Sequence, residues 1–242
     1  MVNHLFEELD YQVTPLGAIS LRRRSEPKLN GKIVYEVKLG DEYLMSSLFV
    51  DAEIALAKLG LGVIDGNKID VIVGGLGLGY TAAAVLDDQR VASLKVIDIM
   101  QPVIDWHQKE LVPLGEKIHS DSRCQLIRGN FFDMATSGLG GFDSQHPNKR
   151  YHGILLDIDH SPEHWLNPGN ESFYTMTGVA KMVEQLLPGG VFGLWSNDPP
   201  SKEFMELISP KFAEVSSHVI EFDNPYQGGV SANTVYLAVT SR

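Results

Sequence analysis

The chain has 242 residues, of which 43% are hydrophobic and 21% are charged, proportions ordinary for a globular protein. Its length suits one large α/β domain with a small appendage. The formal net charge of -11 argues against a nucleic-acid backbone or an anionic membrane as the main partner and favours a cationic small molecule. The sequence contains a single cysteine, Cys124, and shows neither a signal-peptide pattern nor a run of about 18 apolar residues. We therefore expect a cytoplasmic protein.

The first part of the chain has the pattern of a small β-structure. Apolar and polar residues alternate between turn residues, which predicts short strands at 11–13, 18–21 and 32–38. We therefore predict that residues 1–50 form a small β-rich appendage built on a β-hairpin. The basic run Arg22 to Arg24 is interpreted either as a solvated strand end or as part of a lid over a bound ligand.

The remainder, residues 51–242, alternates between strand and helix patterns. Strands are predicted at 70–74, 93–98, 124–128, 152–157, 190–196, 215–222 and 234–240, and helices at 52–61, 79–88, 102–112, 172–187 and 201–209. Parallel strands joined by crossover helices form a doubly wound sheet. The last two strands have no helix between them, so one of them should run antiparallel. The prediction is a Rossmann-like, mostly parallel seven-stranded sheet of class I methyltransferase type, with a C-terminal antiparallel hairpin.

The predicted domain is organised around three alternating glycines, Gly75, Gly77 and Gly79, between a buried strand and an alanine-rich helix. Glycine is needed in such a turn because the backbone takes positive φ and must approach a ligand closely. Asp98 ends the next apolar strand, about 20 residues on, where a carboxylate can accept hydrogen bonds from ribose hydroxyls. These four residues predict a binding site for a ligand that contains a ribonucleoside.

The glycine spacing narrows the class of ligand. A dinucleotide fingerprint requires a glycine at position 80, where this chain has Tyr80, so a nicotinamide-dependent dehydrogenase is disfavoured. A phosphate-binding P-loop is excluded because no Gly-Lys-Ser/Thr follows. The observed G-x-G-x-G pattern resembles motif I of the S-adenosylmethionine-dependent methyltransferase fold.

Two further strand ends carry candidate ligand-binding and catalytic residues. Asn130 could read an adenine edge with Phe131 stacked on the base, or its side chain could make only an Asx-type turn. Asp157 ends a very apolar strand and is followed by Asp159 and His160. Carboxylates and imidazoles at one strand end can deprotonate an incoming amine or hydroxyl, or hold a cationic substrate.

A metal site at the second of these strand ends is weighed and set aside. The candidate ligands are Asp157, Asp159, His160 and His164, but Pro162 interrupts the helical spacing that the two histidines would need. The chemistry considered below needs no metal ion, and none is predicted.

The motifs follow one another in an order that resembles the spermidine synthase (polyamine aminopropyltransferase) family. The matches are Gly75 to Tyr80 with the family's glycine loop G-G-G-D-G-G, Asp98 with its ribose acid, Gly129 to Phe131 with its adenine-reading G-D-A/G, Asp157 to Ser161 with its catalytic D-x-x-D-P, and Phe173 to Gly190 with its Y/F-Y … L-x-x-G-G stretch. The similarity covers about three quarters of the chain and is specific in order and spacing.

This resemblance implies a transferase that moves an aminopropyl group from decarboxylated S-adenosylmethionine to an amine such as putrescine. It places the proton-accepting acid at Asp157 and the acceptor pocket at Asp159, His160 and Tyr174. The family's Q-x-T element is not visible in this chain, and Tyr43, which stands near its place, is a further substrate-binding candidate. A homodimer is also a family expectation.

The chain departs from the family at positions that affect specificity. Leu78 replaces the loop aspartate that grips the aminopropyl amine and disfavours a carboxylate, and His160 replaces the second acid of D-x-x-D. Two alternatives therefore stay open. One is a methyltransferase that uses intact S-adenosylmethionine and an unknown acceptor, and the other is a non-catalytic nucleoside-binding module with the same fold.

Overall fold

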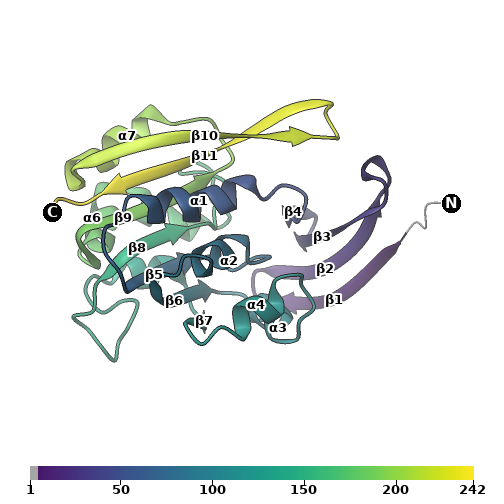
Figure 1. Cartoon of the computed structure of the whole chain (residues 1–242), viewed down its shortest axis with the longest axis horizontal. Helices are drawn as coiled ribbons and strands as arrows, with labels where there is room; N and C mark the ends of the chain where they lie inside the picture. The colour runs from purple at the N-terminus through teal and green to yellow at the C-terminus, as the bar shows by residue number, and fades with distance from the viewer. Residues whose placement is uncertain (1–4) are drawn as a thin grey trace.

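The protein contains two β-sheets, seen at the right and left of Figure 1 in a computed structural model that describes residues 5–242. A four-stranded sheet has the order β1-β2-β3-β4, and a seven-stranded sheet has the order β10-β11-β9-β8-β5-β6-β7. Among the described residues, no helix is long and apolar enough to cross a membrane.

The N-terminal sheet is larger than the predicted hairpin. Its antiparallel strands are β1 (Phe6–Thr14), β2 (Gly17–Glu26), β3 (Lys32–Leu39) and β4 (Glu42–Ser46). The predicted short strands lie inside β1, β2 and β3, whereas β4 was not predicted because five residues give too little alternation. Ile19, Leu21 and Val37 are buried in the same core as the large domain, so the inner face of this sheet packs on it. The sheet ends just before the predicted domain boundary at residue 50, and that boundary stays a prediction.

The seven-stranded sheet confirms the predicted fold class. Its strands are β5 (Ile69–Gly74), β6 (Val91–Asp98), β7 (Cys124–Arg128), β8 (Tyr151–Leu156), β9 (Leu186–Ser196), β10 (Glu214–Asn224) and β11 (Gly229–Val239). Strands β5 to β9 pair in parallel. Strand β11 pairs antiparallel with both β9 and β10, so the C-terminal hairpin contributes the one reversed strand of this sheet.

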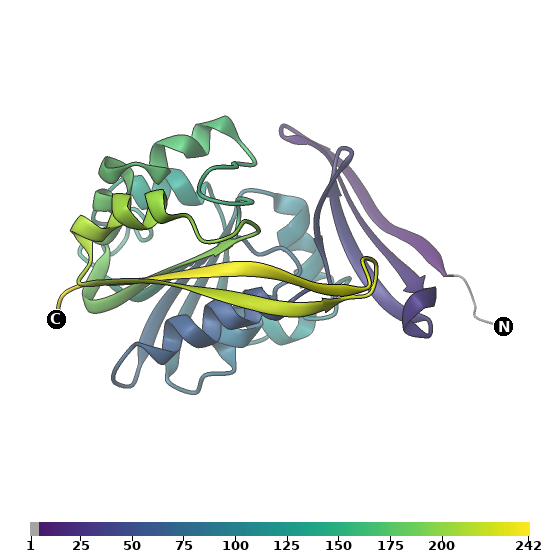
Figure 2. The same ribbon diagram turned by 90° about the horizontal axis from the view of Figure 1, so that it is seen from above.

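Helices cover both faces of this sheet (Figure 2). They are α1 (Asp51–Gly62), α2 (Tyr80–Leu86), α3 (Gln101–Gln108), α4 (Gly115–His119), α5 (Phe131–Thr136), α6 (Met176–Val183) and α7 (Lys202–Ile208), with short 3-10 helices at Pro27–Leu29, Pro168–Tyr174 and Ser209–Lys211. Alternate strand residues face the two layers: Val71 and Val73 pack with α1 to α4, and Ile72 packs with α5 to α7.

One predicted helix was wrong in extent. Residues 172–187 form the end of a 3-10 helix, then α6, and then the start of β9 at Leu186. The interruption occurs at Thr175, whose extended backbone and side-chain hydrogen bond to the Gly178 amide begin a new helix. At the other end Gly189 has φ 73°, which lets the backbone bend within β9. Helices α4 and α5 were not predicted, because each is too short to show a periodic pattern.

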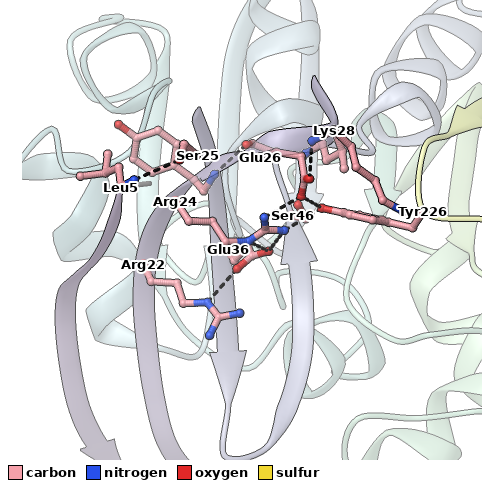
Figure 3. Close-up of polar contacts among 12 residues, drawn as sticks. Leu5, Arg22, Arg24, Ser25, Glu26, Lys28, Glu36, Ser46 and Tyr226 are labelled. Carbon is pink, nitrogen blue, oxygen red and sulfur yellow. Dashed lines mark hydrogen bonds and ion pairs between the residues drawn. The ribbon is translucent and has the colours of Figure 1, made fainter. Parts of the chain in front are cut away.

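The C-terminal hairpin reaches the N-terminal sheet through a polar network (Figure 3). Tyr226 near the hairpin turn donates a hydrogen bond to Glu26 at 2.6 Å and accepts one from Arg24 at 2.6 Å. Glu36 pairs with Arg24 at 2.9 Å and with Arg22 at 2.7 Å. Arg24 therefore connects the sheet to the hairpin and Arg22 pairs within the sheet, while Arg23 on the opposite face pairs with a glutamate of β1. The basic run is not a free strand end, and its interpretation as part of a lid over a ligand stays a prediction.

Candidate active site

A cavity of about 510 Å³ lies where the carboxyl ends of the parallel strands meet the N-terminal sheet. Its wall includes the glycine loop and the acids Glu53, Asp98, Asp133 and Asp157. Among residues 5–242, no lysine or arginine contributes to this wall. A concave site with several carboxylates and no fixed cation attracts positively charged ligands.

The glycine loop has the geometry that its sequence predicts. Gly75, Gly77 and Gly79 all have positive φ, at 92°, 48° and 89°. A Cβ atom at Gly75 would overlap the backbone oxygen of Asp157, and one at Gly77 would overlap the Met45 side chain. A larger residue at Gly75 would therefore separate the loop from β8, whereas one at Gly77 would displace the end of the flexible Met45 side chain.

A buried histidine forms a hydrogen bond with the backbone of the glycine loop. His107 of α3 is fully buried, and its Nε2 lies 2.9 Å from the carbonyl oxygen of Gly77. A carbonyl oxygen only accepts, so Nε2 carries the hydrogen and donates. Burial lowers the pKa of His107 to about 4, which keeps the ring neutral at pH 7. His107 is not among the residues that the sequence predicts for the site.

Asp98 lies on the cavity wall beside the loop, as predicted. Its Oδ2 accepts a hydrogen bond from the Leu76 amide at 3.0 Å, and Oδ1 accepts one from the Met100 amide at 2.8 Å. Burial raises the pKa of Asp98, while these amide hydrogen bonds lower it. The Gly77 amide acts on the carboxylate in the same way. The carboxylate still lies on the cavity wall, where it can accept a hydrogen bond from a ribose hydroxyl.

Asn130 and Phe131 follow β7 on the same wall, but the structure uses them differently from one another. Asn130 caps α5 by accepting a hydrogen bond from the Phe132 amide at 3.0 Å. This leaves its amide nitrogen as the group that can donate to an adenine. The Phe131 ring is only 2% exposed and packs against Phe132, Phe142 and Phe173, so little of it is open to a stacked base.

Asp157 follows the last residue of β8 and faces the cavity. Its amide donates to the Gly74 carbonyl at 2.8 Å, which fixes the strand end against the glycine loop. Its Oδ2 accepts a hydrogen bond from the Thr81 hydroxyl at 2.7 Å. Burial raises the pKa of Asp157 to about 6, although the Thr81 hydrogen bond lowers it. A carboxyl group whose pKa lies close to neutral pH is suited to accept a proton from an amine.

Glu53 is a site residue that the sequence reading missed. It comes from the first turn of α1, and its carboxyl lies on the cavity wall. Burial, and then the negative charge of Asp157, raise the pKa of Glu53 to about 8. The two acids therefore share a proton near pH 7. A signal was present, since Glu53 is an acid inside the otherwise apolar stretch Ala52 to Ala57.

The raised pKa values predict that this pair destabilises the protein as pH rises. The folded state keeps protons that the unfolded state, with an ordinary glutamate pKa of 4.5, has already released, so the free energy of unfolding falls between about pH 4.5 and pH 8. Glu53→Gln cannot ionise. We expect it to melt above the wild type at about pH 8.5, by about 3 °C for each kcal/mol gained. Calorimetry at about pH 4 should show no such gain; an equal gain at both pH values would contradict the ionisation argument.

The four predicted acceptor residues occupy three different environments. Of these, only His160 lies on the cavity wall, where its Nε2 is 2.9 Å from the Glu42 carboxylate of β4. Asp159 is 1% exposed and accepts a hydrogen bond from the Tyr174 hydroxyl at 2.9 Å, and neither lies on the wall. Tyr43 is 54% exposed and packs under Arg22, outside this cavity.

The buried pair still affects the cavity indirectly. Asp159 also accepts hydrogen bonds from the Leu166 amide and from the Asn170 side chain, both at 2.8 Å. Leu166 and Asn170 are on the cavity wall. Asp159 and Tyr174 therefore hold a segment of the cavity wall from behind, and their predicted role as substrate-binding residues stays a prediction. Among residues 5–242, no group of three or more His, Cys, Asp or Glu could hold a metal ion.

The chain is similar to known proteins in sequence and in fold. No family model matches the chain. A polyamine aminopropyltransferase of Prochlorococcus marinus (strain NATL1A) is 27% identical over 168 residues, which cover 68% of this chain and 52% of the relative. The chain is therefore similar in sequence to a polyamine aminopropyltransferase. It spans about half the length of this curated relative.

Two solved structures have a fold similar to that of this chain. A spermidine synthase in complex with the transition-state analogue AdoDATO superposes with a TM-score of 0.74 at 17% identity, over 97% of this chain and 74% of the other. The spermidine synthase of Thermotoga maritima superposes with a TM-score of 0.71 at 16% identity, over 97% of this chain and 72% of the other. Identities this low show the fold, and the predicted resemblance is confirmed at that level.

Proposed function

We propose that this protein transfers an aminopropyl group from decarboxylated S-adenosylmethionine to a small amine such as putrescine. The observation that carries the proposal is the cavity wall, which has four carboxylates and, among the described residues, no lysine or arginine. Both substrates are cationic, so this wall complements them. The similarity to a polyamine aminopropyltransferase supports the same reading.

In this proposal each part of the site has a role. The glycine loop makes room for the tail of the nucleoside, Asp98 accepts hydrogen bonds from the ribose hydroxyls, and Asn130 donates to the adenine. The amine nitrogen attacks the carbon next to the sulfonium, the carbon–sulfur bond breaks, and sulfur leaves as the thioether of methylthioadenosine. Asp157 takes the proton that the nitrogen loses. The protein contributes orientation and proton removal, and no metal ion is needed.

Methyl transfer from intact S-adenosylmethionine is the second candidate. Leu78 favours it, because nothing acidic at that position repels the carboxylate of the intact molecule. The cavity wall disfavours it, because that carboxylate would enter a site with four acids and no arginine or lysine among the described residues. A non-catalytic module is the third candidate, and a turnover assay separates it from both enzymes.

Ligand-dependent melting tests the proposal. The panel is decarboxylated S-adenosylmethionine, S-adenosylmethionine, methylthioadenosine and NAD. A ligand that binds only the folded state adds about 2.7 kcal/mol at a hundredfold excess over its Kd. We expect stabilisation by the decarboxylated form and by methylthioadenosine, a smaller effect of the intact form and none of NAD. An equal or larger effect of the intact form would favour methyl transfer, and no response to any adenosyl ligand would refute nucleoside binding.

Three further statements stay predictions beside this proposal. They are a cytoplasmic location, a homodimer, and a division of the chain near residue 50 into an appendage and a catalytic domain. Fractionation, sedimentation and expression of residues 51–242 alone would test them.

A further inference from the structure

The acids of the cavity wall can bind a positively charged group of the ligand, and which acid does so is inferred here on the basis of the proposed function. The glycine loop offers no side chain for this purpose. Leu78, in the middle of the loop, is 3% exposed and belongs to the hydrophobic core with α1 and α2. The cavity must therefore bind an ammonium group through acids supplied by other elements.

Glu53 is in the right place to do so. It lies on the same wall as the loop, and its backbone carbonyl is 3.3 Å from the Thr81 hydroxyl in the first turn of α2. That hydroxyl also contacts Asp157, so Thr81 holds α1, α2 and the end of β8 together. The Asp98 carboxylate accepts a hydrogen bond from the Leu76 amide at the start of the loop. The Glu53 backbone carbonyl instead contacts Thr81, just after Gly79 at the end of the loop. A nucleoside with its ribose at Asp98 would extend its tail along the loop toward Glu53.

Within residues 5–242, no lysine or arginine lies on the cavity wall beside Glu53 to neutralise its charge. The groups that act on its ionisation are the acids Asp157 and Asp51, and Tyr80 lies close enough to feel its charge. Two half-buried acids facing each other without a counter-ion are costly to ionise. A ligand ammonium beside Glu53 removes the cost of ionising the two acids, so this part of the cavity favours a cation.

We propose that Glu53 binds the primary ammonium group of the aminopropyl tail of the nucleoside, in place of an acid on the glycine loop. Asp157 is then left to accept the proton of the attacking amine. On binding, the proton that the two acids share passes to solvent, and the ammonium takes its place. Selectivity for the decarboxylated nucleoside follows, since an extra carboxylate near the ammonium would face Glu53 and Asp157.

Calorimetric titration of Glu53→Gln with decarboxylated S-adenosylmethionine and with methylthioadenosine tests this proposal. Methylthioadenosine has no ammonium group, so it reports on the nucleoside site alone. We expect the variant to bind the decarboxylated nucleoside about 10- to 100-fold more weakly, which is the loss of one charged hydrogen bond, and to bind methylthioadenosine as the wild type does. The control is Asp51→Asn, an exposed acid in the same turn of α1 that is off the cavity wall, and it should change neither affinity.

Three outcomes would overturn the assignment while leaving the proposed function standing. The variant could bind the decarboxylated nucleoside as tightly as the wild type, or the wild type could bind both ligands equally. The variant could instead keep both nucleoside affinities and raise only the KM of the acceptor, which would place Glu53 at the acceptor. Failure of the wild type to bind methylthioadenosine would refute the proposed function itself.

Discussion

Replacing Asp157 by asparagine is expected to lower turnover by about 100- to 10,000-fold, because the variant cannot accept a proton from the attacking amine. Asparagine has nearly the same shape, and its side-chain oxygen can still accept the Thr81 hydrogen bond. Affinity for methylthioadenosine should therefore stay at the wild-type value. Single-turnover release of methylthioadenosine measures the chemical step, and titration with the same compound measures binding.

The matched control for this variant is Asp133→Asn. Asp133 also lies on the cavity wall, at the start of α5, so the control removes one wall charge without touching the Thr81 contact. We expect its single-turnover rate at saturating substrate to stay within a small factor of the wild type, with any effect of the lost wall charge confined to KM. Full activity of Asp157→Asn would show that another group accepts the proton. Absence of turnover in the wild type, with nucleoside binding intact, would favour the non-catalytic module.

Gly75→Ala is expected to destabilise the protein by about 3 kcal/mol or more, a large part of the 5 to 15 kcal/mol typical of a folded protein. Two effects combine. The residue has φ 92°, which strains an alanine, and the added Cβ would overlap the backbone oxygen of Asp157. Backbone cannot rotate away as a side chain can, so the loop must move off β8. Denaturant unfolding measures the loss, and affinity for methylthioadenosine should fall with it.

Gly66→Ala separates the two effects. Gly66 has nearly the same φ, 90°, but a Cβ there would meet nothing within 4 Å. Its loss of stability therefore reports backbone strain alone and should be about 1 to 2 kcal/mol. If both variants lost the same amount, the close contact between Gly75 and Asp157 would not contribute, and the loop would be held by something other than β8.

Much of the fold was predictable because each β-α unit is read locally. The strand before Gly75 is a continuous apolar run, as expected of a parallel strand buried on both faces. The reversal at β11 followed from the lack of a crossover helix. The elements that were not predicted are short: β4, α4 and α5 each have too few residues to show a period, and they are stabilised by tertiary packing.

In the site, the residues that could be predicted from the sequence are those whose position depends on local backbone structure. Gly75, Gly77 and Gly79 needed positive φ, and Asp98 and Asp157 ended apolar strands whose carboxyl ends lie at one edge of a sheet. Such residues can be recognised because a strand, a turn and a helix start are local patterns.

Which polar groups lie close together in the cavity could not be predicted from the sequence, because this depends on how distant elements pack. Glu53 of α1 and Asp157 after β8 are far apart in the chain, so no spacing in the sequence could pair them. The same packing put Asp159 and Tyr174 behind the wall, although Asp159 is two residues from Asp157. Burial and charge act through space, and they depend on the packing of α1, α2 and β8, which a linear pattern does not contain.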